Sequence, residues 1–377
     1  MNISLKLVTV SLFFWGVGEG MFLLFQPIYL QQLGANPIAI GAILGGMGLM
    51  TTIAQIPSGI ISDRFDTRPI MWFSWILGTI AAWSMALAGN LQFFTVGLLL
   101  YGLTGSVMAP MNAYITDMRG EWSAERALTL TAAAYHLGTV VGPSLGGFLG
   151  QQFDLKILYL IAAIIFILST ALVLLIKKPA FEEHHDPGQG SHIFRNKPFM
   201  LIAVFGFLGL FFMIFTQSFT PVFLDDFRSL SLQQIGYLGT IGSLGNVLLA
   251  LLIGNFAARK GYLIGFPLVF LFPLLIFFGK GFTVYAAAYF FFGGYRLSRS
   301  MLLAFGRQFI KSRDTGLAYG VLETANGAAT ILAPLICGLI YNQNPQLIFF
   351  VAMGGLGITL LCSLLWLPVA KPDRNIL

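Results

Sequence analysis

Long, unbroken apolar segments are the feature of this sequence that most restricts its fold. Among 377 residues, 57% are hydrophobic and only 10% are charged, whereas about a quarter of the residues in a water-soluble domain are charged. A bilayer requires apolar helices of about 20 residues, and the chain has room for about twelve of them. A membrane β-barrel would show strands of about ten residues with alternating hydrophobicity. The sequence therefore predicts an all-α membrane protein with twelve transmembrane helices.

Short polar segments and turn residues separate the expected helices. The predicted ranges are 7–31, 37–61, 69–89, 91–117, 124–150, 155–176, 198–223, 232–257, 262–279, 282–308, 315–340 and 346–368. The longest polar segment, 177–197, contains Pro, Gly, His and charges of both signs, which is typical of a flexible linker. We therefore expect an N-terminal six-helix bundle over 1–176, a cytoplasmic linker over 177–197 and a C-terminal six-helix bundle over 198–377.

Basic residues favour one side of these helices. If the N-terminus is cytoplasmic, the outer turns contain only Lys156, Arg228 and Lys280, and the remaining loop Lys and Arg residues lie inside. Because cytoplasmic loops carry an excess of Lys and Arg, this distribution predicts that both termini are cytoplasmic. The expected location is the cell inner or plasma membrane.

Several other functions are excluded by what the sequence lacks. The basic residues are scattered rather than arranged in a continuous stripe, which argues against nucleic-acid binding. Cys337 and Cys362 both lie in apolar segments and have no metal-ligand spacing. No glycine-rich nucleotide-binding loop and no nucleophile motif is present. We expect no enzyme activity, no cofactor and no metal site.

The two halves of the chain resemble each other at an offset of about 190 residues, which is typical of a duplicated transporter. The repeat predicts two pseudo-symmetric six-helix bundles. The aligned pairs are Gly41 with Gly236, Gly59 with Gly254, Arg64 with Arg259, Tyr101 with Tyr289 and Gly105 with Gly293.

The loop after the second predicted helix reads GIISDRFDTR, from Gly59 to Arg68. It resembles the loop signature of the major facilitator superfamily, whose members have two six-helix halves. Gly59, Asp63, Arg64 and Arg68 match that signature. Asp66 and Thr67 depart from it, where the family usually has Gly and a basic residue. The resemblance implies that the matching residues take part in conformational gating.

The fifth predicted helix contains GTVVGPSLGG, from Gly138 to Gly147. This segment is similar to a pattern found in the drug/proton antiporter branch of that superfamily, and Gly138, Gly142, Pro143 and Gly147 match it. Small residues four apart allow close helix packing, and a proline bends a helix. The same residues can therefore serve gating or packing alone. Tyr101 stands where proton-coupled drug exporters often have Arg, so their coupling scheme does not transfer directly.

Ionisable residues deep in the helices are candidates for function, because burying a charge in a bilayer is expensive. Glu19, His136 and Glu323 are the candidate proton-coupling residues. Glu19 is flanked by glycines, and the alternative is a protonated Glu19 that packs against the fourth or fifth helix. Arg299 and Glu323 lie at similar distances from the turn that joins their helices, which predicts an ion pair. That pair can serve coupling, substrate binding or structure.

Polar and aromatic side chains in the helices are candidates for lining a substrate cavity. Asp117 and Arg126, near the turn after the fourth helix, are candidates for a conformational latch, and the alternative is a set of solvated loop charges. The predicted substrate-binding residues are Trp15, Gln26, Asn112, Tyr135, Gln217, Tyr289, Arg296, Arg299 and Asn326.

These features predict a secondary active transporter that works by alternating access. We expect proton-coupled export of a small amphiphilic or anionic molecule, by a monomer that contacts membrane lipids. Two alternatives remain open: a flippase for a lipid or glycolipid, and an uptake symporter for a sugar or an organic anion.

Overall fold

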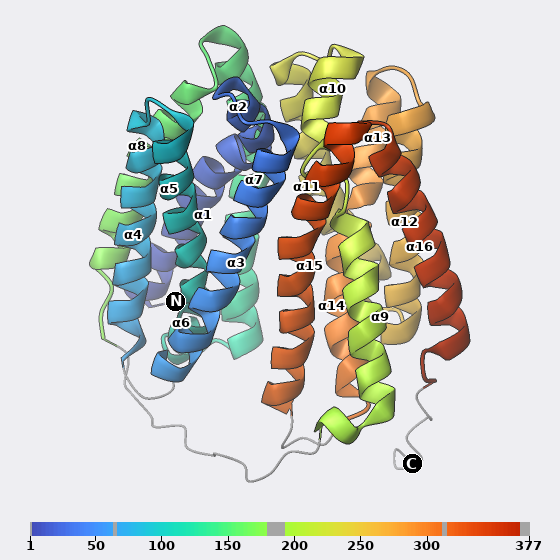
Figure 1. Cartoon of the computed structure of the whole chain (residues 1–377). Helices are drawn as coiled ribbons and strands as arrows, with labels where there is room; N and C mark the ends of the chain where they lie inside the picture. Colours follow the sequence, from blue (N-terminus) through green and yellow to red (C-terminus); the bar gives the residue numbers. More distant parts are fainter. Residues whose placement is uncertain (1, 63–65, 179–192, 311–314, 370–377) are drawn as a thin grey trace. The chain divides into compact units, whose positions relative to one another are not determined.

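The computed structural model describes residues 2–62, 66–178, 193–310 and 315–369, which are helical with short connections and contain no strand (Figure 1). The helices of the first part are α1 (Ile3–Leu23), α2 (Gln26–Gln32), α3 (Pro37–Ser62), α4 (Thr67–Leu87), α5 (Leu91–Gly102), η1 (Leu103–Val107), α6 (Met108–Asp117), α7 (Ala124–Gln152) and α8 (Lys156–Leu174). The later ones are η2 (Ile193–Arg195), α9 (Lys197–Ile214), α10 (Thr220–Arg228), α11 (Leu232–Ile253), α12 (Ala258–Phe278), α13 (Phe282–Phe292), α14 (Gly294–Arg307), α15 (Thr315–Gln343) and α16 (Leu347–Trp366).

Polar residues fix where several helices begin. The side chains of Asn2, Asn90, Ser123 and Asn196 each accept a hydrogen bond from a backbone N–H in the first turn of the following helix. Such caps satisfy donors that have no partner within the helix. They explain why the helices start at the polar positions between the apolar segments.

The described residues contain ten helical segments that are long and apolar enough to cross a membrane. Two further crossings complete the predicted twelve. One is α7, which is long enough but contains Glu125, Arg126 and His136. The other consists of α13 and α14, which are each too short alone and meet at Gly293. The prediction of an all-α membrane protein with twelve transmembrane helices is confirmed.

Four of the predicted ranges contain an interruption of the α-helix, which the sequence analysis did not predict. The structure divides them into α1 and α2, α5 and α6, α9 and α10, and α13 and α14. Pro27 and Pro221 stand at the starts of α2 and α10 in related segments, FQPIYL and FTPVFL. Because proline lacks an N–H, it is favoured in the first turn of a new helix. These segments are a further part of the internal repeat.

The chain forms two compact units. Unit 1 comprises Met1–His185 together with Ser218–Ser243, and unit 2 comprises Asp186–Gln217 together with Leu244–Leu377. The predicted division at the 177–197 linker remains a prediction.

Unit 1 is built around α1, which packs against α7 and α8, while α4 packs against α5 and α8. Figure 1 shows α4 and α8 side by side. A buried polar cluster joins three of these helices: the Trp75 Nε1 donates to the hydroxyls of Ser11 (2.9 Å) and Ser169 (3.0 Å), which are 2.7 Å apart. Polar groups that are buried in this way need such partners.

Unit 2 is built around α12, which packs against α13, α14 and α16, while α9 packs against α14, α15 and α16. Ser298 on α14 and Tyr262 on α12 are completely buried, and the Ser298 hydroxyl donates to the Tyr262 carbonyl at 3.3 Å. The Tyr262 hydroxyl in turn donates to the Phe205 carbonyl on α9 at 2.7 Å. These contacts fix which face of α14 is buried, and therefore which face is left open.

Candidate functional site

Glu19 and Tyr135 form the polar contact at the centre of unit 1. The Tyr135 hydroxyl on α7 donates to Glu19 Oε2 on α1 at 2.9 Å, and both residues are half-buried. Glu19 lies sixteen residues after Ile3 and thirteen before Gln32, or about 24 Å and about 20 Å along the helices. The carboxylate is therefore near the middle of the crossing. The ring of His136 meets the Tyr135 ring edge to face at 5.4 Å.

An aromatic cluster fills the unit beside this contact. The Trp15 ring stacks on Phe166 with centroids 4.1 Å apart and lies 5.4 Å from Trp75. Trp15 is only 9% exposed, and Gln26 is also buried at the first position of α2. Their predicted role in substrate binding stays a prediction, and the structure shows a packing role for Trp15.

The glycines of α7 allow two other helices to approach it closely. A side chain at Gly138 would collide with the Phe13 carbonyl of α1, and one at Gly142 would lie 2.6 Å from the Val17 carbonyl. On another face, a side chain at Gly147 would lie 2.6 Å from the Leu232 carbonyl of α11. Close approach of this kind needs small residues. The α1 contact also sets the rotation of α7 that brings Tyr135 to Glu19.

Two hydroxyl groups of α11 bond to α7 next to Pro143, and the sequence alone did not reveal them. Pro143 has no N–H to donate to the Thr139 carbonyl four residues earlier. The Ser243 hydroxyl donates to that carbonyl at 3.1 Å, and the Thr240 hydroxyl donates to the Val140 carbonyl at 2.7 Å. The signal that could have revealed them is two hydroxyl residues three positions apart, and therefore on one face, in a helix that is apolar over much of its length.

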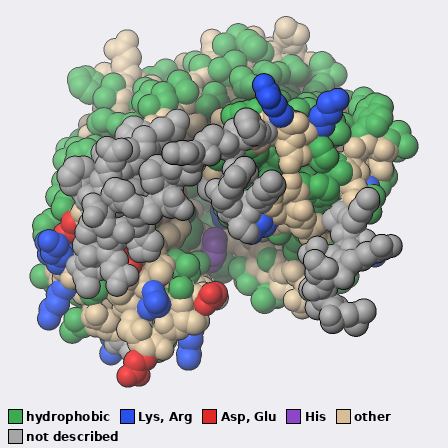
Figure 2. All heavy atoms as spheres, turned by 90° about the horizontal axis from the view of Figure 1, so that it is seen from below, with side chains coloured by type: hydrophobic (Ala, Val, Ile, Leu, Met, Phe, Trp, Pro, Cys, Tyr) green, Lys and Arg blue, Asp and Glu red, His purple; other side chains and the backbone are tan. Residues whose placement is uncertain are grey.

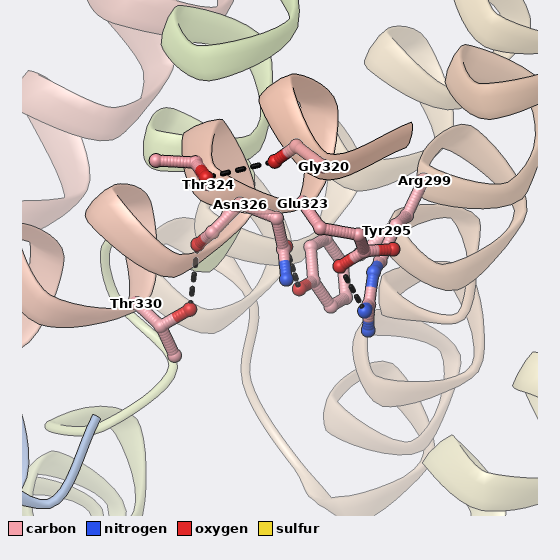
Figure 3. Close-up of polar contacts among 7 residues, drawn as sticks. All are labelled: Tyr295, Arg299, Gly320, Glu323, Thr324, Asn326 and Thr330. Carbon is pink, nitrogen blue, oxygen red and sulfur yellow. Dashed lines mark hydrogen bonds and ion pairs between the residues drawn. The ribbon is translucent and has the colours of Figure 1, made fainter. Parts of the chain in front are cut away.

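Arg299 and Glu323 form the principal polar contact of unit 2 (Figure 3). Arg299 Nη2 on α14 lies 2.7 Å from Glu323 Oε2 on α15, and these side chains are 40% and 35% exposed. The predicted contact is confirmed. One turn away, the Tyr295 hydroxyl donates to Asn326 Oδ1 at 3.1 Å. Arg296 lies on the same helix and is exposed.

Three other predicted substrate-binding residues lie outside these two clusters. Tyr289 is buried on α13, where its ring meets Phe272 edge to face at 5.3 Å. Asn112 is exposed on α6, and Gln217 is exposed between α9 and α10. Among the described residues, no side-chain hydrogen bond joins Tyr289, Asn112 or Gln217 to the Glu19 or the Arg299 cluster.

The predicted gating loop is described only in part. Gly59 lies in α3, whereas Asp63 and Arg64 lie outside the described residues. Arg68 lies on α4, 3.7 Å from Asp66, and its guanidinium is 4.7 Å from the ring centroid of Trp72. Asp66 caps α4 by accepting from the Arg68 N–H at 3.0 Å. Asp66, which departs from the family signature, thus has a structural role.

The turn between α6 and α7 contains the other predicted latch residues. Asp117 is the exposed last residue of α6, and Arg126 in the first turn of α7 lies over the Trp122 ring at 4.4 Å. Figure 2 shows acidic and basic side chains beside hydrophobic ones on the face viewed there. A latch role for this pair remains a prediction.

The fold and its two deep polar clusters define a polytopic membrane transporter of two helical bundles. A sequence model of the Major Facilitator Superfamily matches residues 8–304 and 221–376. The chain belongs to this superfamily, and it is a transporter rather than an enzyme.

Its relatives include drug-resistance proteins. The tetracycline resistance protein, class B, of Escherichia coli is 25% identical over 364 residues, which cover 91% of this chain and 90% of that protein. Multidrug resistance protein 1 of Bacillus subtilis (strain 168) is 20% identical over 377 residues, which cover 97% of this chain and 96% of that protein. The resemblance to these drug-resistance proteins therefore extends over nearly the whole chain.

A solved structure of the nucleoside transporter NupG has the same fold. It matches with a TM-score of 0.81 at 16% identity, and the match covers 97% of this chain and 99% of that one. A bacterial homologue of the human lysosomal transporter Spinster matches with a TM-score of 0.70 at 15% identity over 97% of this chain and 93% of that one. At these identities the likeness shows the fold alone.

Proposed function

We propose that this chain is a proton-coupled exporter of a small amphiphilic or anionic molecule. The similarity to tetracycline and multidrug resistance proteins over nearly the whole chain supports export. The chain would work as a monomer in the cell inner membrane, with both termini cytoplasmic, in line with the distribution of its Lys and Arg residues.

The contact between Glu19 and Tyr135 supports the proton-coupling part of the proposal. A carboxyl group near mid-membrane can lose its charge by taking up a proton, which removes the large cost of an ion at that depth. The Tyr135 hydroxyl, 2.9 Å away, donates when the carboxylate is ionised and can accept when it is protonated. Both protonation states of Glu19 thus keep a hydrogen bond, as a group that repeatedly loads and releases a proton requires.

Alternating access supplies the remaining steps. Protonation of Glu19 would favour one of two conformations and deprotonation the other, because a bound proton shifts a conformational equilibrium only when it binds the two states differently. Substrate held near the midplane would leave as the proton enters. Coupling then means that the bound substrate is exchanged for a bound proton in each cycle.

Flux in proteoliposomes tests this function. With 2-naphthoate, an aromatic monoanion, as the probe, a pH gradient should accelerate efflux by the wild type, and Glu19→Gln should lose this acceleration while downhill exchange continues. Glu121→Gln makes the same chemical change at an exposed turn residue and is the matched control. If an imposed pH gradient changes neither rate nor accumulation in the wild type, or Glu19→Gln keeps the acceleration, the proton-coupling proposal is wrong.

A further inference from the structure

Helix α14 has one buried face and one open polar face. Leu297, Ser298, Met301 and Leu302 are buried, and they pack toward α12 and α9. The opposite face is polar and includes Arg296 and Ser300, both exposed, and the half-buried Arg299. The buried contacts set the rotation of α14, so its polar face is turned away from α12 and α9.

The polar face lies close to the middle of the membrane. α13 and α14 together run from Phe282 to Arg307, and Arg296 comes fourteen residues after the start and eleven before the end. At 1.5 Å per residue it lies about 21 Å from one end and about 17 Å from the other, in a core about 30 Å thick. A guanidinium facing lipid at this depth is very unfavourable. The face of α14 that contains Arg296 therefore lines a water-accessible space.

The charges on this face do not cancel. Arg299 is neutralised by Glu323 at 2.7 Å. Arg296 has no ion-pair or hydrogen-bond partner among the described residues of the chain. Because Arg is always protonated at physiological pH, the cluster of Arg296, Arg299 and Glu323 has a net charge of one positive unit.

The neighbouring groups leave few other donors for a ligand. The hydroxyls of Thr324 and Thr330 donate to carbonyls of their own helix, at 2.7 Å each, as Figure 3 shows. Asn326 accepts a hydrogen bond from Tyr295 through Oδ1. Its amide nitrogen is therefore left available as a donor to a ligand. The Tyr295 ring stacks near the Phe292 ring, with centroids 6.1 Å apart. Within the part of the chain that the structure describes, the face thus combines a cation without a counter-ion, one amide donor and an aromatic surface.

We propose that Arg296 binds the substrate and restricts it to monoanions: an aromatic or amphiphilic molecule with one carboxylate, or an anionic group of similar shape. The guanidinium holds the anionic group through two parallel hydrogen bonds, the Asn326 amide supplies a further donor, and the apolar part of the substrate lies along Phe292 and Tyr295. This inference rests on the proposed transport function and specifies its substrate class. Because Glu323 neutralises Arg299, the site has one positive charge to offer and favours a substrate with one negative charge.

Equilibrium binding to the purified full-length protein in nanodiscs tests the charge preference. The probes are 2-naphthoate, a monoanion, and 2-naphthamide, its neutral counterpart. The wild type should prefer 2-naphthoate. Arg296→Gln should weaken 2-naphthoate binding about 10- to 100-fold and leave 2-naphthamide unchanged. Arg296→Lys should recover part of the affinity, because Lys keeps the charge but not the bidentate geometry.

Arg307→Gln is the matched control, since it removes the same charge from the end of the same helix. Glu323→Gln adds a second test, because it leaves Arg299 without its counter-charge. This variant should bind the dianion 2,6-naphthalenedicarboxylate more tightly than the wild type does. The inference is wrong if the wild type shows no preference for 2-naphthoate, if Arg307→Gln matches Arg296→Gln, or if Glu323→Gln does not gain dianion affinity. Failure of proton coupling leaves these binding results unaffected, so the two proposals can fail separately.

Discussion

The environment of Asp225 predicts that the stability of the folded protein depends on pH. It lies on α10, beyond the apolar span of α9, and burial raises its pKa above the usual 3.8, with a smaller contribution from the negative charge of Asp226. A raised carboxyl pKa means that the folded state binds the proton more tightly than the unfolded state does. Stability is therefore lost as the pH rises from 3.8 through the pKa of the folded state.

Asp225→Asn removes this dependence and should raise the midpoint of thermal unfolding at pH 7, with little difference from the wild type at pH 4. Scanning fluorimetry of the detergent-solubilised protein at the two pH values measures the effect. Asp154→Asn, the same change at an exposed position that caps α8, is the control. An equal shift for Asp225→Asn at both pH values would show that a neutral side chain acts there through packing and not through ionisation.

A contact between two side chains was predictable only where the sequence places both residues at the same depth in the membrane. Arg299 and Glu323 lie on consecutive helices, at similar distances along the sequence from the turn that joins them. These distances predicted the ion pair, which the structure shows at 2.7 Å. For Glu19 the sequence left two helices open as neighbours. The structure selects Tyr135, because the packing of Gly138 and Gly142 against α1 sets the rotation of α7. The rotation of a helix about its axis depends on its contacts with segments that are distant in sequence. Hydropathy contains no information on these contacts.

At the scale of elements, the segment of α7 around Pro143 receives a hydrogen bond from another helix. The Ser243 hydroxyl satisfies the Thr139 carbonyl that Pro143 leaves without its usual donor. Ser243→Ala should lower stability by about 0.6 kcal/mol and at most about 1.7 kcal/mol, the average and the maximum for hydrogen bonds between membrane helices. It should also speed hydrogen exchange in the first half of α11. Thr95→Ala is the control, because the Thr95 hydroxyl bonds only to Leu91 of its own helix. Equal effects of the two variants would contradict a role for the interhelical bond.

Helix breaks were the part of the fold that the sequence analysis did not predict. Hydropathy is averaged over about 19 residues. The interruptions at 24–25, 103–107, 215–219 and 293 are much shorter than that window, so the average does not show them. Pro27 and Pro221 were visible in the sequence, and their matching surroundings could have revealed two of the breaks. The breaks fall in the first, fourth, seventh and tenth crossings, which are equivalent positions of the two repeats. They are therefore a property of the repeated unit.

At the scale of the whole molecule, the internal repeat was the most reliable guide. α7 and α15 both contain 29 residues, and Pro143 and Pro334 occupy the same position within them. Twelve crossings and membership of the superfamily followed from apolar length, repeat and motif. The polar residues of the two clusters do not repeat. Tyr135 of α7 corresponds to Asn326 of α15, and Glu323 has Ala132 as its counterpart. Duplication accounts for the scaffold, and divergence of these positions accounts for the separate chemistry of the two units.

The two proposals together predict that transport moves charge. If one monoanion leaves for each proton that enters, each cycle moves the equivalent of two positive charges inward, and a potential of 100 mV, negative inside, contributes about 4.6 kcal/mol. A neutral substrate exchanged for one proton would gain about half of that, and a monovalent cation would gain nothing.

Proteoliposomes of uniform orientation, with valinomycin and a potassium gradient but no pH gradient, should therefore export 2-naphthoate against its gradient. In Arg296→Gln, export of 2-naphthamide should continue with about half the dependence on potential. Export of 2-naphthoate that is insensitive to potential would contradict the exchange of one monoanion for one proton, because that exchange cannot be electrically neutral.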